Sequence, residues 1–326
     1  SDRNGQFNLF TYHVSTAEIK QLTRFTDFPV INMSARGGEI VFEQAGYLHI
    51  FDLTTGASHK LAVGIAADLQ ELRPRFVKGD PYIRTADLSP TGARAVFDFR
   101  GDILTVPAEK GDARNLTLSP GVHEKYPAWS PDGKSIACFS DASGEYVLQI
   151  RPQDGKGEVR TYPLNGAGFY AYPKWSPDGK KICFVDNGRN LYMLDVASGT
   201  VIRIDSDEVY FPGPFREQFG DWSSDSKWFA YTKIRTTNFS IIYLYSLELG
   251  NSFALTDGLS DATEPVFDPG NRYLFFFAST DAGPLVNWFD QSNLDMQSNN
   301  SIYLVTIQKD TLSPFARESD EEKAIL

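Results

Sequence analysis

The stretch YPAWSPDGK at Tyr126–Lys134 recurs as YPKWSPDGK at Tyr172–Lys180. In each copy a large apolar residue, which we call the anchor, stands directly before the turn sequence SPDG. Weaker copies of the stretch occur four more times. The six anchors are Met33, Leu88, Trp129, Trp175, Trp222 and Phe267. Successive anchors lie 55, 41, 46, 47 and 45 residues apart. A near-constant period of this length indicates a repeat architecture, in which each repeat is one supersecondary unit.

Each repeat has the pattern of a small antiparallel sheet. Four residues after the anchor stands a turn former, such as Gly133 or Gly179. Gly and Pro around this position favour a tight reversal of the chain. A third run rich in Tyr, Ile, Leu and Val follows each time, and a weaker fourth run follows a further glycine. The sequence therefore predicts an all-β fold, a β-propeller of four-stranded antiparallel blades with six full blades.

The N-terminal residues predict half of another blade. Ser1–Leu9, SDRNGQFNL, matches Ser140–Leu148, SDASGEYVL, which lies between a second and a third strand. Phe7–Tyr12 and Glu18–Leu22 are then expected as third and fourth strands. Either the C-terminal segment completes this blade, which gives a seven-bladed ring, or the half blade is a remnant of a preceding domain beside six blades. An irregular first blade in a complete protein is a further alternative. The predicted domains are residues 1–26 as the half blade, 27–312 as the propeller and 313–326 as an acidic linker toward further domains.

Composition excludes some classes of function. The chain has 326 residues, a net charge of −11 and a pI near 4.9. Nucleic-acid binding requires a basic surface, so we expect no nucleic-acid partner. No apolar run approaches the ~18–20 residues that span a bilayer, so we expect no membrane partner. Two cysteines, Cys138 and Cys183, are expected to be buried and unpaired, and the compartment stays undetermined, with cytoplasmic favoured over periplasmic.

The sequence contains no recognisable catalytic constellation. The four histidines lack the spacing of a zinc hydrolase helix, and no G-x-S-x-G nucleophile motif is present. Asp132 and Asp178 lie in the SPDG turns, where an Asp side chain bonds its own backbone. We therefore expect no catalytic residue, no metal site and no cofactor in this chain.

Candidate binding residues come from two features. Long insertions interrupt the repeats at Glu208–Phe219 and Asp281–Asn300. Insertions on a rigid scaffold often contain the residues that bind a ligand or partner. Aromatic residues and arginine commonly anchor interfaces, and the residues of these types in the two insertions are Phe215, Arg216, Trp288 and Phe289. The second feature is the residue before each anchor. Lys174 and Asp221 occupy this position in adjacent repeats, and we expect their charges to approach each other near the centre of the ring.

Longer stretches of the sequence resemble one protein family. LTRFTDFPV at residues 22–30, ARGGEIVFEQAGYLHIFDLTTG at 35–56 and DLSPTGARAVFDFRGDILTVPAEKGDARNLT at 87–117 are similar to the propeller region of tricorn-like serine peptidases. So is YPAWSPDGKSIACFSDASGEYVLQIRP at 126–152. DTLSPFARESDEE at 310–322 resembles the connector from that propeller toward PDZ-like and catalytic domains. The short WSPDGK phrase alone is shared with TolB-like propellers.

This resemblance implies tandem propellers followed by serine peptidase domains that lie outside the present residues. It further implies that the propeller admits oligopeptides to an enclosed chamber, and that the full-length protein forms homo-oligomers. The partners expected are therefore oligopeptides and the protein's own peptidase domains. Two alternatives remain from the sequence: a TolB-like protein–protein interaction propeller, and the propeller of a prolyl-oligopeptidase-type hydrolase.

Overall fold

The computed structural model describes residues 1–73, 76, 78–165, 168–209, 220–281, 299–317 and 320. The chain divides into two compact units, Ser1–Phe76 and Val77–Leu326, and each is described by itself. Both units are built from antiparallel sheets, which confirms the predicted all-β propeller architecture.

The first unit contains a two-stranded and a four-stranded sheet. The small sheet pairs β1 (Phe10–His13) with β2 (Glu18–Gln21). The larger sheet has the order β3-β4-β5-β6. Its strands are β3 (Val30–Arg36), β4 (Glu39–Gln44), β5 (Tyr47–Asp52) and β6 (Ser58–Lys60). Leu9, Ile40, Phe42 and Phe51 form a common core, so the two-stranded sheet packs on the four-stranded one.

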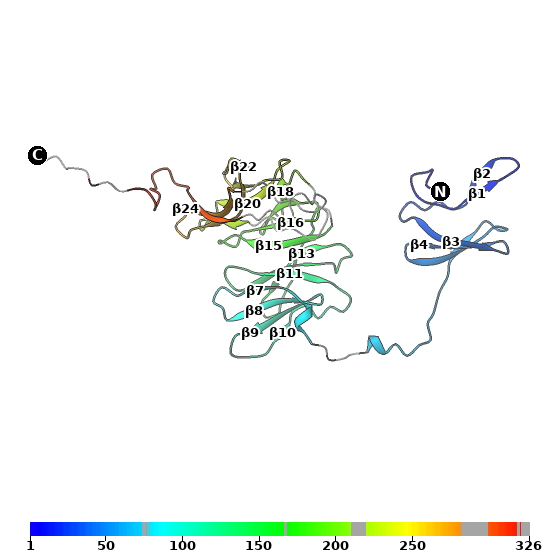
Figure 1. The fold of residues 1–326 in the computed structure, drawn as a ribbon. Coiled ribbons are helices and arrows are strands. Elements are labelled where there is room, and N and C mark those ends of the chain that lie inside the picture. Colours follow the sequence, from blue (N-terminus) through cyan, green and yellow to red (C-terminus); the bar gives the residue numbers. More distant parts are fainter. Residues whose placement is uncertain are drawn as a thin grey trace, which may run out of the picture. The chain divides into compact units, whose positions relative to one another are not determined.

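The second unit is a succession of five sheets, which Figure 1 shows in chain order from cyan at β7 to orange at β24. Two short 3-10 helices precede β7 in the chain: η1 (Gln70–Leu72) belongs to the first unit and η2 (Asp80–Tyr82) to the second. Each of its first four sheets has four strands that are neighbours in chain order. The last sheet has three strands among the described residues.

The strands of the second unit have the following bounds. The first blade has β7 (Ile83–Leu88), β8 (Arg94–Phe99), β9 (Asp102–Pro107) and β10 (Arg114–Asn115). The second has β11 (Glu124–Trp129), β12 (Ser135–Ser140), β13 (Val147–Pro152) and β14 (Arg160–Tyr162). The third has β15 (Tyr170–Trp175), β16 (Lys181–Asp186), β17 (Asn190–Asp195) and β18 (Val201–Ser206). The fourth has β19 (Asp221–Trp222), β20 (Trp228–Ile234), β21 (Ser240–Ser246) and β22 (Asn251–Ala254). The fifth has β23 (Asp261–Phe267), β24 (Tyr273–Ser279) and β25 (Ser301–Thr306).

A repeated threonine contact identifies equivalent strands in the two units. In each case the backbone N–H of a buried residue on or beside a third strand donates to a threonine hydroxyl that follows the fourth strand. The pairs are Leu9 with Thr23 at 2.9 Å, Ile103 with Thr117 at 3.2 Å and Ile242 with Thr256 at 3.1 Å. The threonine contact of β1 and β2 has the same pattern as that of these third and fourth strands, and the assignment of residues 1–26 to half of a blade stays a prediction.

The blades are held together by apolar side chains that pack face to face. One buried cluster joins the blade β11–β14 to the blade β15–β18, with Phe139, Phe184 and Leu194 at its centre. The following clusters join β15–β18 to β19–β22 and β19–β22 to β23–β25. Cys138 and Cys183 are buried in different clusters and are both free thiols. The core is thus a series of layers between sheets.

The SPDG turns of successive blades contact each other, and this contact favours the same turn residues in each repeat. A side chain at Gly133 would meet Pro90 of the preceding turn at 3.6 Å, and Gly179 has the same relation to Pro131. Gly133 has φ of +68°, which glycine adopts without strain. Asp132 accepts hydrogen bonds from the Ser130 hydroxyl at 2.7 Å and the Lys134 backbone N–H at 3.0 Å. These two hydrogen bonds, mainly the one from the Ser130 hydroxyl, lower the pKa of Asp132. This agrees with a structural role of Asp132 in the turn.

The anchors differ in burial. Trp129, Trp222 and Phe267 are 6%, 5% and 9% exposed, and Trp175 is partly buried. Leu88 and Met33 are 67% and 64% exposed. The choice of Met33 needs a correction, since Ala35 pairs with Ile40 as Trp129 pairs with Ile136. The turn at Gly37–Gly38 is two residues shorter than an SPDG turn. Aligning the repeats on their turn residues therefore placed the first anchor two residues too early, at Met33.

The boundary between the compact units lies inside the predicted propeller domain. The first full repeat, β3–β6, belongs to the unit that ends at Phe76, whereas the other five repeats form the second unit. The sequence signal for this division was the longest anchor step, 55 residues, which spans Ile65–Tyr82. The domain limits 1–26, 27–312 and 313–326, and the number of blades in a closed ring, stay predictions.

Candidate functional site

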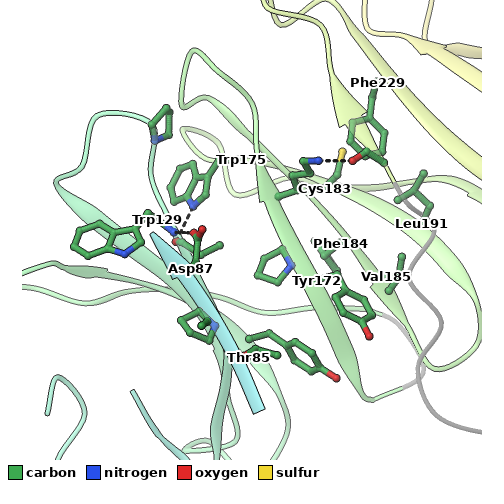
Figure 2. A pocket seen from close by; sticks show the side chains of 18 residues that line it. Thr85, Asp87, Trp129, Tyr172, Trp175, Cys183, Phe184, Val185, Leu191 and Phe229 are labelled. Atoms are coloured by element: carbon green, nitrogen blue, oxygen red, sulfur yellow. Dashed lines mark hydrogen bonds between the residues drawn. The ribbon is translucent and has the colours of Figure 1, made fainter. Parts of the chain in front are cut away.

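A cavity of about 570 Å³ lies on the first strands of consecutive blades in the second unit. Its wall takes Thr85–Asp87 from β7, Tyr126–Trp129 from β11 and Tyr172–Trp175 from β15. Cys183 on β16 also reaches it (Figure 2). Gly220, which precedes β19, lines it as well. Its volume falls in the range of small-molecule and peptide-segment pockets, roughly 300–1,000 Å³.

Two tyrosines line this cavity because of a bulge in each first strand. The pairing register shifts between Lys125 and Ala128 in β11 and between Ala171 and Lys174 in β15. At these bulges Tyr126 and Tyr172 adopt φ of +53° and +54°. A β-bulge redirects the side chain of the strand in which it occurs. The two rings lie 5.1 Å apart between centroids, with an angle of 57° between their planes.

The tyrosine hydroxyl of Tyr126 stays protonated at neutral pH. Burial raises the pKa of Tyr126 to about 12, and Tyr172 and Asp98 beside it act in the same direction. Asp98 lies behind the wall, only 2% exposed, and its carboxylate accepts the Tyr126 backbone N–H at 3.4 Å. The Tyr126 side chain at the cavity wall is therefore neutral.

The residues before the anchors bind neighbouring blades together. Asp87 accepts the backbone N–H of Trp129 at 2.7 Å, as the dashed line in Figure 2 marks, and Asp221 accepts that of Phe267 at 2.9 Å. Where the residue before the anchor is not Asp, an indole makes the contact instead. The Trp175 Nε1–H donates to the Ala128 carbonyl at 3.2 Å, and that of Trp222 to the Lys174 carbonyl at 3.3 Å.

Lys174 and Asp221 meet as the sequence predicts. The Lys174 Nζ lies 3.3 Å from the Asp221 Oδ1 and donates to the Gly220 carbonyl at 2.5 Å. The Lys174 side chain is 49% exposed and that of Asp221 is 23% exposed. A pair with this exposure contributes ~0–1 kcal/mol to stability. Its contact is confirmed, and its part in binding a ligand stays a proposal.

Among the described residues, the cavity wall contains one thiol, that of Cys183. Cys183 is 1% exposed, and burial raises the pKa of its thiol well above the usual value. The thiol is therefore neutral and unreactive. Over the described ranges, no three His, Cys, Asp or Glu side chains gather as a metal-binding group. No helix in the described part of the chain is long and apolar enough to cross a membrane.

Four of the predicted binding residues cannot be placed. Phe215, Arg216, Trp288 and Phe289 lie outside the described residues, in 210–219 and 282–298. Conversely, the sequence analysis did not identify Tyr126 and Tyr172 as site residues. Their signal was present in the YP that opens both strong copies of the repeat, three and two residues before the anchor.

Comparisons with known proteins identify relatives of this chain. A tricorn protease homolog from Saccharolobus solfataricus is 27% identical over 321 residues, covering 98% of this chain and 28% of that protein. Tricorn protease homolog 1 from Streptomyces coelicolor is 23% identical over 342 residues, covering 97% of this chain and 30% of that protein. The chain therefore spans about a third or less of these two relatives.

A solved structure supports the fold. The crystal structure of the tricorn protease superposes with a TM-score of 0.61 at 16% identity, covering 98% of this chain and 31% of that chain. The family model of the tricorn protease second β-propeller domain matches residues 83–324. This match begins at β7, close to the boundary between the two compact units. The chain therefore belongs to the family of the tricorn protease second β-propeller domain.

Proposed function

We propose that this chain is a non-catalytic propeller region that binds oligopeptides in the cavity on its first strands and guides them to peptidase domains of the same protein. The observation that carries the proposal is the cavity itself, which successive blades line with equivalent residues. A site of this kind can contact an extended peptide repeatedly, one blade after another.

The chemistry of the cavity supports binding without cleavage. Its thiol is buried and protonated, and its charged residues are engaged in bonds between blades. Peptide hydrolysis requires an activated nucleophile or a metal-bound water. The relatives are proteases that extend well beyond the residues matched here, so the peptidase role belongs, in this proposal, to other parts of the protein.

Filling the cavity should abolish peptide binding. Ala86 on β7 lines the cavity and has an exposed side chain, so Ala86→Trp adds bulk there with little cost to the blade. We expect Ala86→Trp to weaken the binding of a fluorescein-labelled mixed octapeptide pool by at least about tenfold, ~1.4 kcal/mol. Fluorescence anisotropy with the 326-residue chain measures the change.

The matched control is Ala113→Trp, because Ala113 is also exposed and does not line the cavity. This variant should bind the pool as the unmodified chain does, and mass spectrometry should recover the peptides uncleaved. Equal binding by Ala86→Trp and Ala113→Trp would place the peptide site elsewhere. Failure of the unmodified chain to bind any peptide in the pool would refute the proposed function.

A further inference from the structure

Two carboxylates are buried where the first blade of the second unit (β7–β10) packs on the next blade (β11–β14), a contact that we call the first junction. Asp98 on β8 is 2% exposed, and Glu124, the first residue of β11, is fully buried. The Asp98 Oδ2 accepts the backbone N–H of Tyr126 from the next blade at 3.4 Å. The Glu124 Oε1 accepts the hydroxyl of Ser119, between the two blades, at 2.7 Å. Both carboxylates therefore belong to the first junction.

Each of these carboxylates has one oxygen without a hydrogen bond. The Oδ1 of Asp98 and the Oε2 of Glu124 are buried and have no partner in the part of the chain that the structure describes. The same holds for the indole N–H of Trp129, which packs at the first junction. The equivalent indoles of Trp175 and Trp222 donate to carbonyls of the preceding blade. A buried ionised oxygen without a donor loses its hydration and gains nothing in return, so these groups weaken the first junction.

Three cationic or titratable side chains face Asp98. Arg84 lies on β7, Lys125 on β11, and His123 in the connection between the two blades. They lower the pKa of Asp98, as does the hydrogen bond from the Tyr126 backbone. Burial has a larger effect than all of these and raises the pKa of Asp98 above its usual value. The closed junction therefore favours the protonated form of this group.

Glu124 has a different set of neighbours and the same direction of shift. Burial is the main cause that raises the pKa of Glu124, and the charge of Asp102 acts in the same direction. The guanidinium of Arg151, 3.8 Å from the Glu124 Oε1, lowers it. The Cys138 thiol beside them is neutral, because burial raises its pKa to about 12. The other polar neighbours of Glu124 are Ser119, Thr117 and Ser140.

The cavity wall crosses the first junction. Thr85–Asp87 line it from β7 and Tyr126–Trp129 from β11 (Figure 2). We propose that Asp98 and Glu124 make the first junction a proton-sensitive switch, which opens when both carboxylates are ionised and closes when they are protonated. Opening lets water reach the buried oxygens, and it moves the β7 part of the cavity wall away from the β11 part. This inference goes beyond the proposed function and does not depend on peptide binding.

The direction of the pH dependence follows from the pKa shifts. The closed junction binds protons on Asp98 and Glu124 more tightly than a hydrated, open junction does, since burial raises both pKa values. The stabilisation from these two groups is therefore complete at acidic pH and is lost as the pH rises through their raised pKa values. Hydrogen bonds lower the pKa values of Asp132 and Asp195, so these carboxylates act in the opposite direction and only at more acidic pH.

Hydrogen exchange followed by mass spectrometry tests the switch in the unmodified 326-residue chain. After correction for the intrinsic exchange rates, we expect the protection of β8 (Arg94–Phe99) and β11 (Glu124–Trp129) to rise at least about threefold between pH 8 and pH 5. The reference segment is β21 (Ser240–Ser246), a central strand of another blade. Its protection should stay constant. An equal rise in β21, or no rise in β8 and β11, would overturn the proposal.

Variants assign the pH dependence to the two carboxylates. The double variant Asp98→Asn with Glu124→Gln should show the same protection of β8 and β11 at both pH values. The matched control is Asp112→Asn with Glu109→Gln, which changes the net charge equally through two exposed residues of the same blade. This control should keep the full rise. Circular dichroism confirms that each variant is folded.

The single variants keep the test decisive if the double variant does not fold. Asp98→Asn and Glu124→Gln should each lose part of the rise in protection. A full rise in both single variants, or in a folded double variant, would assign the pH dependence to another group, such as His123, and would overturn the role of the buried carboxylates.

Discussion

Trp222→Ala is expected to lower the free energy of unfolding of the second unit by about 3–5 kcal/mol. Trp222 is 5% exposed and belongs to the buried cluster that joins Cys183 and Met193 of the preceding blade to Phe229 of its own blade. Its ring centroid lies 5.0 Å from that of Phe229. Truncation leaves a void between the blades and also removes the indole donor to the Lys174 carbonyl.

Urea denaturation followed by far-UV circular dichroism measures this loss, because the signal does not depend on the removed indole. Leu249→Ala is the control on the same blade, since Leu249 is 64% exposed between β21 and β22. It should change stability by less than about 0.5 kcal/mol. A loss below about 1 kcal/mol for Trp222→Ala would mean that the anchors do not hold the blades together.

Arg189→Met is expected to cost about 3–5 kcal/mol, because it leaves a buried carboxylate without its cationic partner. The Arg189 guanidinium donates to the carboxylate of Asp207 through its Nε and one of its Nη atoms, and the two side chains are 12% and 1% exposed. The other carboxylate oxygen of Asp207 accepts the Ile234 backbone N–H at 2.9 Å, which joins two blades. The same urea titrations measure the change.

Lys174→Met is the matched comparison, because it breaks an ion pair that is largely exposed to solvent. We expect it to cost at most about 1 kcal/mol. The double variant Arg189→Met with Asp207→Asn should recover part of the stability, since it removes the uncompensated charge. Equal losses for Arg189→Met and Lys174→Met would contradict the view that burial decides the contribution of each pair.

The blades could be predicted because the residues that define them act locally. The SPDG turn requires glycine and a self-bonding aspartate, so Gly133 and Asp132 repeat with the turn. The approach of Lys174 and Asp221 was also predictable, since equivalent positions on adjacent blades must be close. These features depend on the spacing of residues along the chain, which can be read directly from the sequence.

The cavity and the division into units could not be predicted in the same way. The bulges at Tyr126 and Tyr172 combine a positive φ with a following proline, and neither propensity nor alternation of apolar residues indicates such a backbone. The separation after Phe76 depends on which sheets pack together, a property of distant contacts. The exposed Leu88 illustrates this, because its repeat pattern matches that of the buried anchors.

Photo-crosslinking tests the central claim, that the first strands of the blades form a peptide-binding surface. A benzophenone-bearing version of the mixed octapeptide pool, irradiated with the chain and mapped by mass spectrometry, should label segments that contain Tyr126–Trp129 and Tyr172–Trp175. The labelling should disappear in Ala86→Trp. Labelling confined to outer strands such as β14 (Arg160–Tyr162), with the first strands unmodified, would contradict the account.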